Sequence, residues 1–329
     1  MSRSSFIIHH SSLVLLCVAL AAIATPAASQ QYPARPIRLI VPTTPGGSVD
    51  TLARTIGPKL SERWGQQVVV DNRAGAGGTI AAEVTAKSPP DGYTVMLGTI
   101  ASLGTNVSLQ KKLPYDPLKD FAPVTLVATQ NLVLTVHPSL PAKSVRELVK
   151  LARSRPGQLT FASAGNGTGS HLSGELFKLL AGVELLHIPY KGVAPALVDV
   201  ISGQVSMSFP SILTSLAQVN SGRLRALAVT GAHRSAALPD LTTMQEAGIK
   251  GYESATWYGI VAPTATPPEI VNKLSVEVAA ILKQPDTRER IARDGADPVG
   301  NSPQEFGRFM QSEIEKWRKV IRAAGIQPG

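Results

Sequence analysis

Short runs of β-branched and other apolar residues alternate along the chain with stretches in which apolar residues recur every three or four positions. The runs Ile37–Val41, Val68–Val70 and Thr94–Leu97 predict strands, and the spacing over Val49–Arg63 predicts a helix with one apolar face. Strands that alternate with amphipathic helices are typical of an α/β protein with parallel strands. Ligands of open α/β sheets bind outside the carboxyl ends of the strands, so the loops that follow strands are the candidate sites.

The alternation resumes in a second group of elements, which the chain enters near Thr129–His137 and leaves near Trp257–Gly259. The strands predicted in this group are Leu159–Ser163, Leu186–Tyr190, Val205–Phe209 and Ala226–Thr230. We therefore predict two lobes, residues 30–130 with 255–329 and residues 131–254. Two such lobes joined by two crossings form a hinged clam with the ligand in the cleft between them.

Residues that flank the helices predict several helix ends. A hydroxyl residue stands three positions before a glutamate at Ser144–Glu147, Thr266–Glu269 and Ser302–Glu305. Ser48 is expected to cap the helix that follows Gly47, and Gly325 is expected to end the last helix. The chain after the second crossing is expected to be mostly helical.

The first 29 residues are predicted to be a cleaved signal peptide. Arg3 is the only charged residue before an apolar run over 13–24, which is too short for a stable membrane span, and small residues lead to Ser29. We expect cleavage near Ser29 and export from the cytoplasm, with an uncleaved anchor as the alternative. Lipidation of Cys17 is disfavoured because Leu16 precedes it inside the apolar run.

Composition excludes several functions for the mature chain. Cys17 is the only cysteine, so the mature chain has no disulfide, cysteine nucleophile or thiolate metal site. The net charge of +9 loses Arg3 with the signal and becomes 9 − 1 = +8, which favours acidic partners. Because the basic residues are scattered and aromatic residues are few, nucleic-acid binding is not expected.

The loop over 41–50 is the first candidate site. Gly46 and Gly47 allow backbone N–H groups to approach a ligand, and the helix that follows adds the positive end of its dipole. This arrangement favours an anion. The alternative is that the glycines only make a tight turn.

Two further loops are rich in glycine. The loop Arg73–Thr79 lacks the last glycine of the dinucleotide fingerprint and the Lys-Ser/Thr of a P-loop. The loop Ser163–Leu172 combines three glycines with hydroxyl and amide side chains that can donate to a carboxylate. His171 is interpreted as a surface or packing residue rather than a base.

The loop Ile188–Gly192 offers Tyr190 as a wall of the cleft and Lys191 as either an anion partner or a solvated charge. No HExxH or GxSxG motif is present, and no carboxylate pair lies beside a nucleophile. Binding is therefore favoured over catalysis, with no cofactor and no metal. The alternatives are an exported α/β hydrolase that uses His171 or Asp50, and a receptor that feeds a sensor kinase.

Taken together, the motifs resemble the substrate-binding proteins of tripartite tricarboxylate transporters, the Bug or TctC-like receptors. The matching segments are Tyr32–Ile37, Pro45–Gly47 with Asp50, Asn72–Gly78, Pro90–Thr94, Ser163–Thr168 with His171–Leu172, His187–Gly192 and Trp257–Pro263. The resemblance implies a periplasmic two-lobed clam of type II that captures a small di-, tri- or aromatic carboxylate. It also implies a membrane permease with one small and one large subunit as partner. We expect a monomer.

The resemblance also implies the ligand-binding residues. These are Thr43, Thr44, Gly46, Gly47, Ser163, Ala164, Gly165, Asn166, Gly167 and Thr168, with Thr99 and Ser102 from the loop after the third strand. Tyr190, Phe209 and Pro210 complete the expected cleft.

Two departures from the family pattern bear on the ligand. The family usually has an aromatic residue before its Pro-Gly-Gly turn, where this chain has Thr43 and Thr44. The family often has an aspartate after the equivalent of Phe209, where this chain has Pro210. Because such an aspartate can meet a ligand amine, we expect a carboxylate without a required ammonium group.

Overall fold

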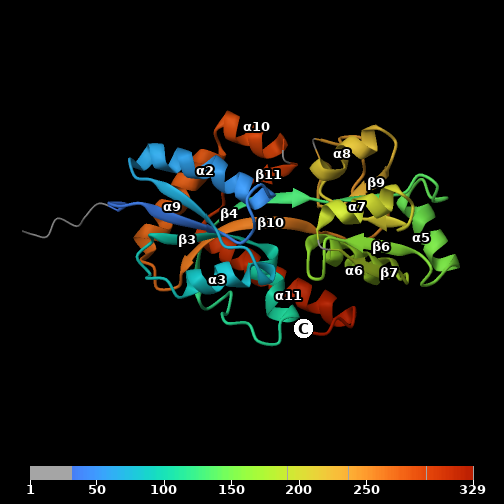
Figure 1. The fold of residues 1–329 in the computed structure, drawn as a ribbon, viewed down its shortest axis with the longest axis horizontal. Coiled ribbons are helices and arrows are strands. Elements are labelled where there is room, and N and C mark those ends of the chain that lie inside the picture. Colours follow the sequence, from blue (N-terminus) through green and yellow to red (C-terminus); the bar gives the residue numbers. More distant parts are fainter. Residues whose placement is uncertain (1–31, 191, 236, 294, 329) are drawn as a thin grey trace, which may run out of the picture. The chain divides into compact units, whose positions relative to one another are not determined.

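The computed structural model describes residues 32–190, 192–235, 237–293 and 295–328, which contain two β-sheets and the helices packed against them (Figure 1). All described helices and strands belong to the compact unit that begins at Pro36. The predicted signal peptide lies outside the described residues. The α/β class predicted from the sequence is confirmed.

The first sheet has six strands in the order β11-β4-β10-β3-β1-β2. Their bounds are β1 (Ile37–Val41), β2 (Val68–Asn72), β3 (Thr94–Thr99), β4 (Phe121–Asn131), β10 (Ala255–Pro263) and β11 (Ala296–Pro298). β1 is parallel to β2 and β3, whereas β10 is antiparallel to β3 and β4, so the sheet is mixed rather than purely parallel.

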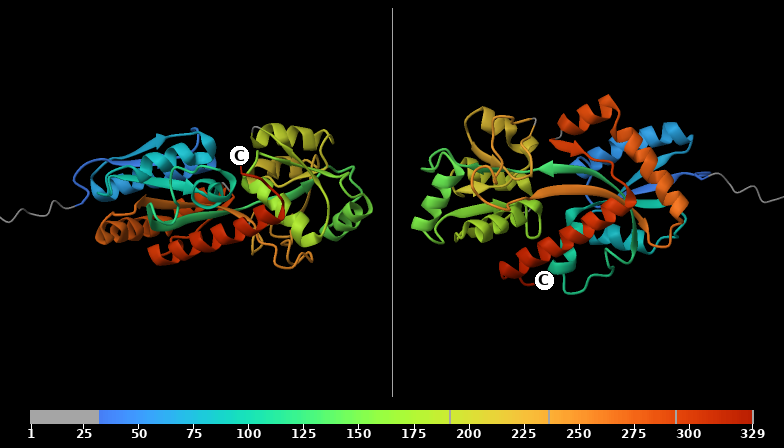
Figure 2. Two further views of the ribbon diagram at one scale, coloured as in Figure 1. Left: turned by 90° about the horizontal axis from the view of Figure 1, so that it is seen from below. Right: turned by 180° about the vertical axis from the view of Figure 1, so that it is seen from behind.

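Helices from the segment before β4 and from the segment after β10 pack on this sheet (Figure 2). They are α2 (Ser48–Trp64), α3 (Thr79–Ala86), α4 (Asn106–Leu109), α9 (Pro268–Leu282), α10 (Pro285–Arg293) and α11 (Pro303–Ala323), with the 3₁₀ turn η1 (Ala76–Gly78) and the π-helical turn η2 (Ala101–Thr105). α2 packs beside β2, and α9 and α11 pack against β4. Their buried apolar residues include Ile56, Val278 and Trp317.

The second sheet has five strands in the order β7-β6-β8-β5-β9. Its strands are β5 (Val133–Val136), β6 (Thr160–Ser163), β7 (Leu186–Pro189), β8 (Met207–Ser208) and β9 (Arg225–Val229), and its helices are α5 (Val145–Ser154), α6 (Gly169–Ala181), α7 (Val193–Ile201) and α8 (Ile212–Asn220). β6 is parallel to β7 and β8, and β5 is antiparallel to β8 and β9. Phe161, Phe177 and Phe209 are fully buried in its core.

The chain passes between the sheets at the carboxyl ends of their parallel strands. Asn131 at the end of β4 pairs with Ala255 at the start of β10, next to the end of β3. On the other sheet, β5 begins beside the end of β8, where the Val133 N–H donates to the Pro210 carbonyl over 2.9 Å. The two predicted crossings are therefore present. The lobe boundaries at 130 and 255 remain a prediction.

Thr230 links the two crossings to each other. The Leu132 N–H donates to Thr230 Oγ1 over 2.9 Å, and the Thr230 N–H donates to the Leu132 carbonyl over 3.0 Å. The Ser254 N–H donates to the Thr230 carbonyl over 2.9 Å. Thr230 is fully buried, so these bonds have no competition from water.

A buried carboxylate fastens the second crossing strand to the last helix. Trp257 in β10 and Trp317 in α11 both donate their indole N–H to Glu313 Oε2 over 2.9 Å, and Lys316 pairs with the other oxygen. Glu313 is 6% exposed. An indole N–H has no other way to be satisfied in an apolar core, so Glu313 is required by both tryptophans.

Several predicted helix ends are confirmed and two are wrong. Ser302 and Glu305 form the full capping box, the Ser144 hydroxyl accepts from the Glu147 N–H, and Gly325 follows α11 with φ of 67°. Thr266 is not a cap, because α9 starts after Pro267 and the Thr266 hydroxyl has no partner among the described residues. Ser48 is also not a cap; it is the first helical residue of α2.

We predict that Glu313→Ala lowers the free energy of unfolding by about 2–4 kcal/mol, because it leaves two buried indole N–H groups without an acceptor. Urea denaturation followed by circular dichroism measures this change. Glu315→Ala, an exposed change on the same helix, is the control and is expected to stay within about 0.5 kcal/mol of the parent. Equal stability of the two variants would contradict the assignment.

Candidate functional site

The loops that follow β1, β2 and β3 meet at one edge of the first sheet. At Gly78, which has φ of 88°, an added Cβ would lie 3.0 Å from Cβ of Pro42 and 3.1 Å from Cβ of Ser102. Only glycine allows this close approach at that backbone angle. Gly78 therefore brings the three loops into contact.

Asp50 in the first turn of α2 holds the loop after β1 in shape. Its carboxylate accepts from the Gly46 N–H over 2.9 Å, from Arg54 Nε over 2.9 Å and from Asn72 Nδ2 over 2.9 Å. The Asn72 amide also donates to the Thr43 carbonyl over 3.0 Å. Burial would raise the pKa of Asp50, but the hydrogen bonds from Arg54, Gly46 and Asn72 keep it below its ordinary value.

The Asp50 carboxylate is engaged by Gly46, Arg54 and Asn72, and no side chain caps the start of α2. Gly47 occupies the N-cap position and provides no side-chain cap, and the first helical bond runs from the Thr51 N–H to the Gly47 carbonyl. The N–H groups of Ser48 and Val49 precede that bond and so lack a partner within the helix. Thr44 and Gly47 are exposed. An anion placed here would meet free N–H groups and the positive end of the helix dipole.

Thr43 contributes a second unsatisfied group at the same loop. Its Oγ1 is buried and has no hydrogen-bond partner among the described residues. It lies 3.8 Å from the position that a Cβ on Gly47 would occupy. The loop thus combines an uncapped helix start with a spare hydroxyl.

The segment after β3, in which a loop was expected to carry Thr99 and Ser102, is partly helical, with η2 and α4 following the strand directly. Ser102 is 1% exposed, and its Oγ accepts from the Thr99 N–H over 3.0 Å. The Tyr115 hydroxyl donates to the Ser102 carbonyl over 2.6 Å. Ser102 therefore orders this loop, and its contact with a ligand, like that of Thr99, remains a prediction.

The loop after β6, Ser163–Thr168, forms a compact turn at the matching edge of the second sheet. The Thr168 hydroxyl donates to the Gly165 carbonyl over 2.7 Å and also caps α6. The Gly165 N–H donates to Ser163 Oγ over 3.1 Å, and the Ala164 N–H donates to Ser170 Oγ over 3.0 Å. Most donors of this loop are thus used internally.

Asn166 is the exception at the tip of this loop. Its side chain is exposed and forms no hydrogen bond with any other described residue. An amide can donate two hydrogen bonds. Asn166 is therefore the side chain of this loop that is most available to a ligand.

Two histidines, the buried His171 and the half-buried His187, lie beneath the loop Ser163–Thr168. The rings of His171 and His187 stack with centroids 4.0 Å apart, and Phe161 stacks on His187 at 4.7 Å. Burial lowers the pKa of His171 to about 3, helped by His187 and Lys178, and lowers the pKa of His187 to about 4, helped by Lys178. Both rings are therefore neutral at neutral pH. The packing interpretation of His171 agrees with this environment, whereas no role was predicted for His187.

Two close approaches join the edges of the two sheets. A Cβ on Gly167 would lie 2.5 Å from Leu109 Cδ1 in α4. A Cβ on Gly169 would lie 2.5 Å from Thr256 Oγ1 in β10. The Ser163–Thr168 loop thus lies against the loop after β3 and against a crossing strand.

Tyr190, Phe209 and Pro210 were expected to line the cleft. In the structure Tyr190 is bonded to Asp199, and Phe209 and Pro210 are buried. The Tyr190 hydroxyl donates to Asp199 Oδ2 over 2.5 Å, and burial and Asp199 raise the pKa of Tyr190 to about 12. Phe209 is fully buried 6.2 Å from the ring of Phe177. Pro210 is buried at the crossing. Their ligand contacts remain predictions, and Lys191 lies outside the described residues.

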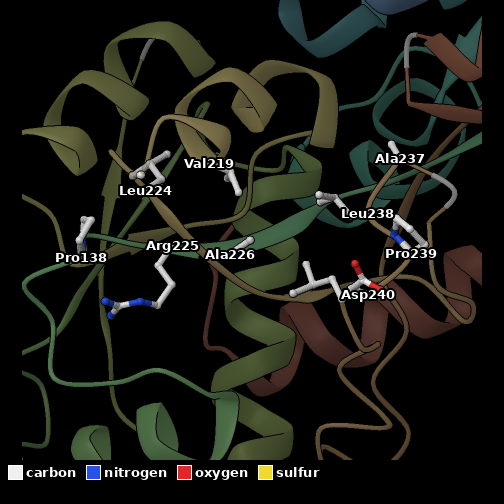
Figure 3. A pocket seen from close by; sticks show the side chains of 11 residues that line it. Pro138, Val219, Leu224, Arg225, Ala226, Ala237, Leu238, Pro239 and Asp240 are labelled. Carbon is white, nitrogen blue, oxygen red and sulfur yellow. The ribbon is translucent and has the colours of Figure 1, made fainter.

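A cavity of about 670 Å³ lies elsewhere, at the edge strand β9 (Figure 3). Its wall is mainly apolar, with Leu224, Ala226 and Leu238 lining it together with Arg225 and Asp240. Arg225 donates to the carbonyls of Leu140 and Ala142 over 3.3 and 3.1 Å. The cavity contains none of the predicted site residues, so it does not mark the same site.

Within the described residues, no three His, Cys, Asp or Glu side chains are grouped as metal ligands would be. None of the helices in this part of the chain combines the length and apolar character that a membrane span needs.

Two α/β lobes, joined by two crossings beside donor-rich loops, define the class of periplasmic solute-binding proteins. The profile of the tripartite tricarboxylate transporter family receptor matches residues 52–326. The chain belongs to this receptor family.

Individual relatives agree with the assignment. Protein BugT of Bordetella pertussis is 39% identical over 317 residues, which are 96% of this chain and 97% of BugT. The structure of R. palustris Rpa4515 with adipate superposes with a TM-score of 0.80 at 43% identity, covering 91% of this chain and all of that one. MatC from Rhodopseudomonas palustris, with bound malate, superposes with a TM-score of 0.75 at 34% identity, covering 88% of this chain and all of that one.

We predict that the histidine pair makes stability fall as the pH is lowered below about 6.5. The unfolded chain takes up protons there, whereas the folded protein does so only near pH 4 at His187 and pH 3 at His171. Each histidine then lowers the free energy of unfolding by at most about 1.4 kcal/mol for each unit by which the pH falls.

Urea denaturation at pH 7.5 and 5.0 tests this, with the variant His171→Asn plus His187→Gln beside the parent. The variant is expected to lose less stability between the two pH values. A parent and variant that lose equal amounts would show that the pair does not control acid stability.

Proposed function

We propose that this receptor captures a small carboxylate in the periplasm and delivers it to a membrane permease. The observation that carries the proposal is the uncapped start of α2 at Gly46–Gly47, where free N–H groups lie beside the loops after β2 and β3. The loop Ser163–Thr168 and the exposed amide of Asn166 supply donors from the second lobe. The relatives that hold adipate and malate support a carboxylate as the ligand class.

The proposed binding residues are those predicted from the sequence. Thr43, Thr44, Gly46 and Gly47 would hold one carboxylate end, and Ser163–Thr168 would close on the ligand from the other lobe. Thr99, Ser102, Tyr190, Phe209 and Pro210 would shape the cleft. The open helix start and the free amide of Asn166 favour this arrangement.

The donors on the two loops are sufficient for useful affinity. Micromolar binding requires about 8 kcal/mol. Charge-assisted hydrogen bonds contribute about 1.5–3 kcal/mol each, and a helix start adds up to about 1 kcal/mol. Three or four donors therefore suffice after ordering costs, without an arginine clamp.

The remaining expectations concern partners and processing. The proposed partner is a permease with one small and one large subunit, and the receptor is proposed to act as a monomer after cleavage near Ser29. The receptor family to which the chain belongs supports a transport partner. N-terminal sequencing of the mature protein tests the cleavage site.

A hydrolase is the second candidate, and its two proposed catalytic residues are engaged in other contacts. His171 is 3% exposed and accepts the Gly167 N–H, while Asp50 is 3% exposed and binds Arg54. Neither is positioned to move a proton to or from a substrate. Turnover of an ester or amide that is abolished by His171→Ala would establish the hydrolase instead. A sensing role uses the same capture step and is distinguished by the partner.

We expect isothermal titration calorimetry to detect binding of dicarboxylates such as adipate or malate, and weaker binding of aspartate or glutamate. The reason is Pro210, which replaces an aspartate that could meet a ligand amine. Tight binding of amino acids with no binding of other carboxylates would overturn the ligand class.

We predict that Asn166→Asp weakens carboxylate binding by about 10- to 100-fold, because it places a negative charge beside the ligand's own. Its effect on thermal stability is expected to be small, since the Asn166 side chain is exposed. Asn220→Asp, which adds the same charge at the exposed end of α8, is the matched control. Equal affinities of the two variants would remove Asn166 from the site.

A further inference from the structure

We propose that His171 and His187 are positioning residues, which set the peptide orientations of the loop Ser163–Thr168 and thereby its affinity for carboxylate. This inference rests on the proposed function, because it concerns how one of the two proposed binding loops is shaped. It assigns roles to one buried and one half-buried histidine that no step of ligand capture otherwise uses.

His171 fixes the peptide group between Asn166 and Gly167. The Gly167 N–H donates to His171 Nδ1 over 3.0 Å. In a trans peptide the carbonyl points opposite to the N–H, so this bond turns the Asn166 carbonyl away from the histidine. The orientation of the loop tip, where Asn166 is exposed, thus depends on an acceptor at the Nδ1 position.

His187 acts on the first turn of the same loop through Ser163. His187 Nε2 lies 2.6 Å from Ser163 Oγ, and that oxygen accepts the Gly165 N–H over 3.1 Å. Ser163 is 1% exposed, so its hydroxyl has no alternative partner in water. Gly165 has φ of 130°, a conformation that needs support from its neighbours.

The two rings act as one unit because they are stacked between β7 and α6. His171 is a residue of α6 and His187 a residue of β7, and their centroids are 4.0 Å apart. Phe161 of β6 stacks on His187 with centroids 4.7 Å apart, and its ring lies 6.4 Å from that of His171. A shift of either ring would therefore disturb both contacts with the loop.

Charged groups around the pair favour one protonation state. Glu175 Oε1 lies 3.8 Å from His171 Nε2, and the Glu175 carboxylate is paired with Lys178, whose Nζ lies 2.8 Å from Oε2. With Nδ1 accepting the Gly167 N–H, a neutral His171 carries its proton on Nε2, which faces Glu175. Burial, His187 and Lys178 lower the pKa of His171 to about 3, so the acceptor at Nδ1 is kept.

A purely packing role makes a different prediction from a positioning role. If the rings only fill space, apolar side chains of similar size would serve as well. If the rings position the loop, the ring atoms that accept or share hydrogen bonds must be retained. Asparagine can place an oxygen near the position of Nδ1, and glutamine can place a polar atom near that of Nε2.

The test compares His171→Leu with His171→Asn, and His187→Phe with His187→Gln. Isothermal titration calorimetry with adipate and with malate gives the affinity, and amide hydrogen exchange of Gly165 and Gly167 in the ligand-free protein gives the state of the loop. His137→Asn is the control, since His137 lies at the opposite end of the second sheet and bonds Ser139.

We expect His171→Leu and His187→Phe to weaken binding about tenfold and to speed exchange at Gly167 and Gly165, respectively. The asparagine and glutamine variants are expected to stay within about threefold of the parent. Apolar variants that bind and exchange like the parent would overturn the inference, and so would polar variants that fail as badly as the apolar ones.

Failure of the proposed function gives a different result. If the parent binds neither probe nor any other carboxylate, the proposal that the receptor binds a carboxylate is wrong. The predicted effect of the histidine variants on affinity then fails as well. The exchange rates of Gly165 and Gly167 still decide whether the histidines hold the loop. If the parent binds and Asn166→Asp does not, while all four histidine variants bind normally, only the positioning inference fails.

Discussion

The bonds of Thr230 to Leu132 and Ser254 hold the two crossings of the chain together, and the location of the site depends on this junction. β4 and β10 leave the first sheet at the carboxyl ends of β1, β2 and β3, and the chain enters the second sheet at the carboxyl ends of β6 and β8. Every loop that follows a parallel strand is therefore directed toward the crossings. A ligand held by loops of both lobes would lie close to these crossings.

Some polar groups of the loops at this junction are hydrogen-bonded within the loops, and others remain available to a ligand. Asp50 and Thr168 satisfy the backbone of their own loops, and the buried Ser102 does so for the loop after β3. The groups that remain without a partner among the described residues are the N–H groups at the open start of α2, the Thr43 hydroxyl and the amide of Asn166. Because the loops are already ordered, a ligand would not have to supply that ordering free energy on binding.

Much of the fold follows from local sequence patterns. β1 begins and ends where its apolar run does, and the capping box at Ser302 is present as predicted. The antiparallel strands β4 and β11 were not predicted, because β4 extends over both apolar and polar residues and β11 has only three residues. Pairing with distant segments, rather than local preference, determines both. The same limit explains Thr266, whose helix begins after the proline and leaves the hydroxyl unused.

The candidate site was predictable in outline, because glycine-rich loops after strands indicate where an anion could approach. The contacts that shape those loops were not. The spacing of Asp50 and Arg54 by four residues on one helix could have indicated their ion pair. The approach of Leu109 to Gly167 and the stacking of His187 on His171 join segments far apart in sequence, and no local pattern encodes them.

The position of Trp257 has a practical consequence for spectroscopy. Its indole is 1% exposed, is fixed by Glu313, and lies 3.3 Å from the place that a Cβ on Gly104 would occupy, in the turn after β3. A rigid fluorophore is thus built into a crossing strand and in contact with a loop at the sheet edge. Its emission can follow rearrangement of that edge without an attached dye, once the contributions of Trp64 and Trp317 are separated from it.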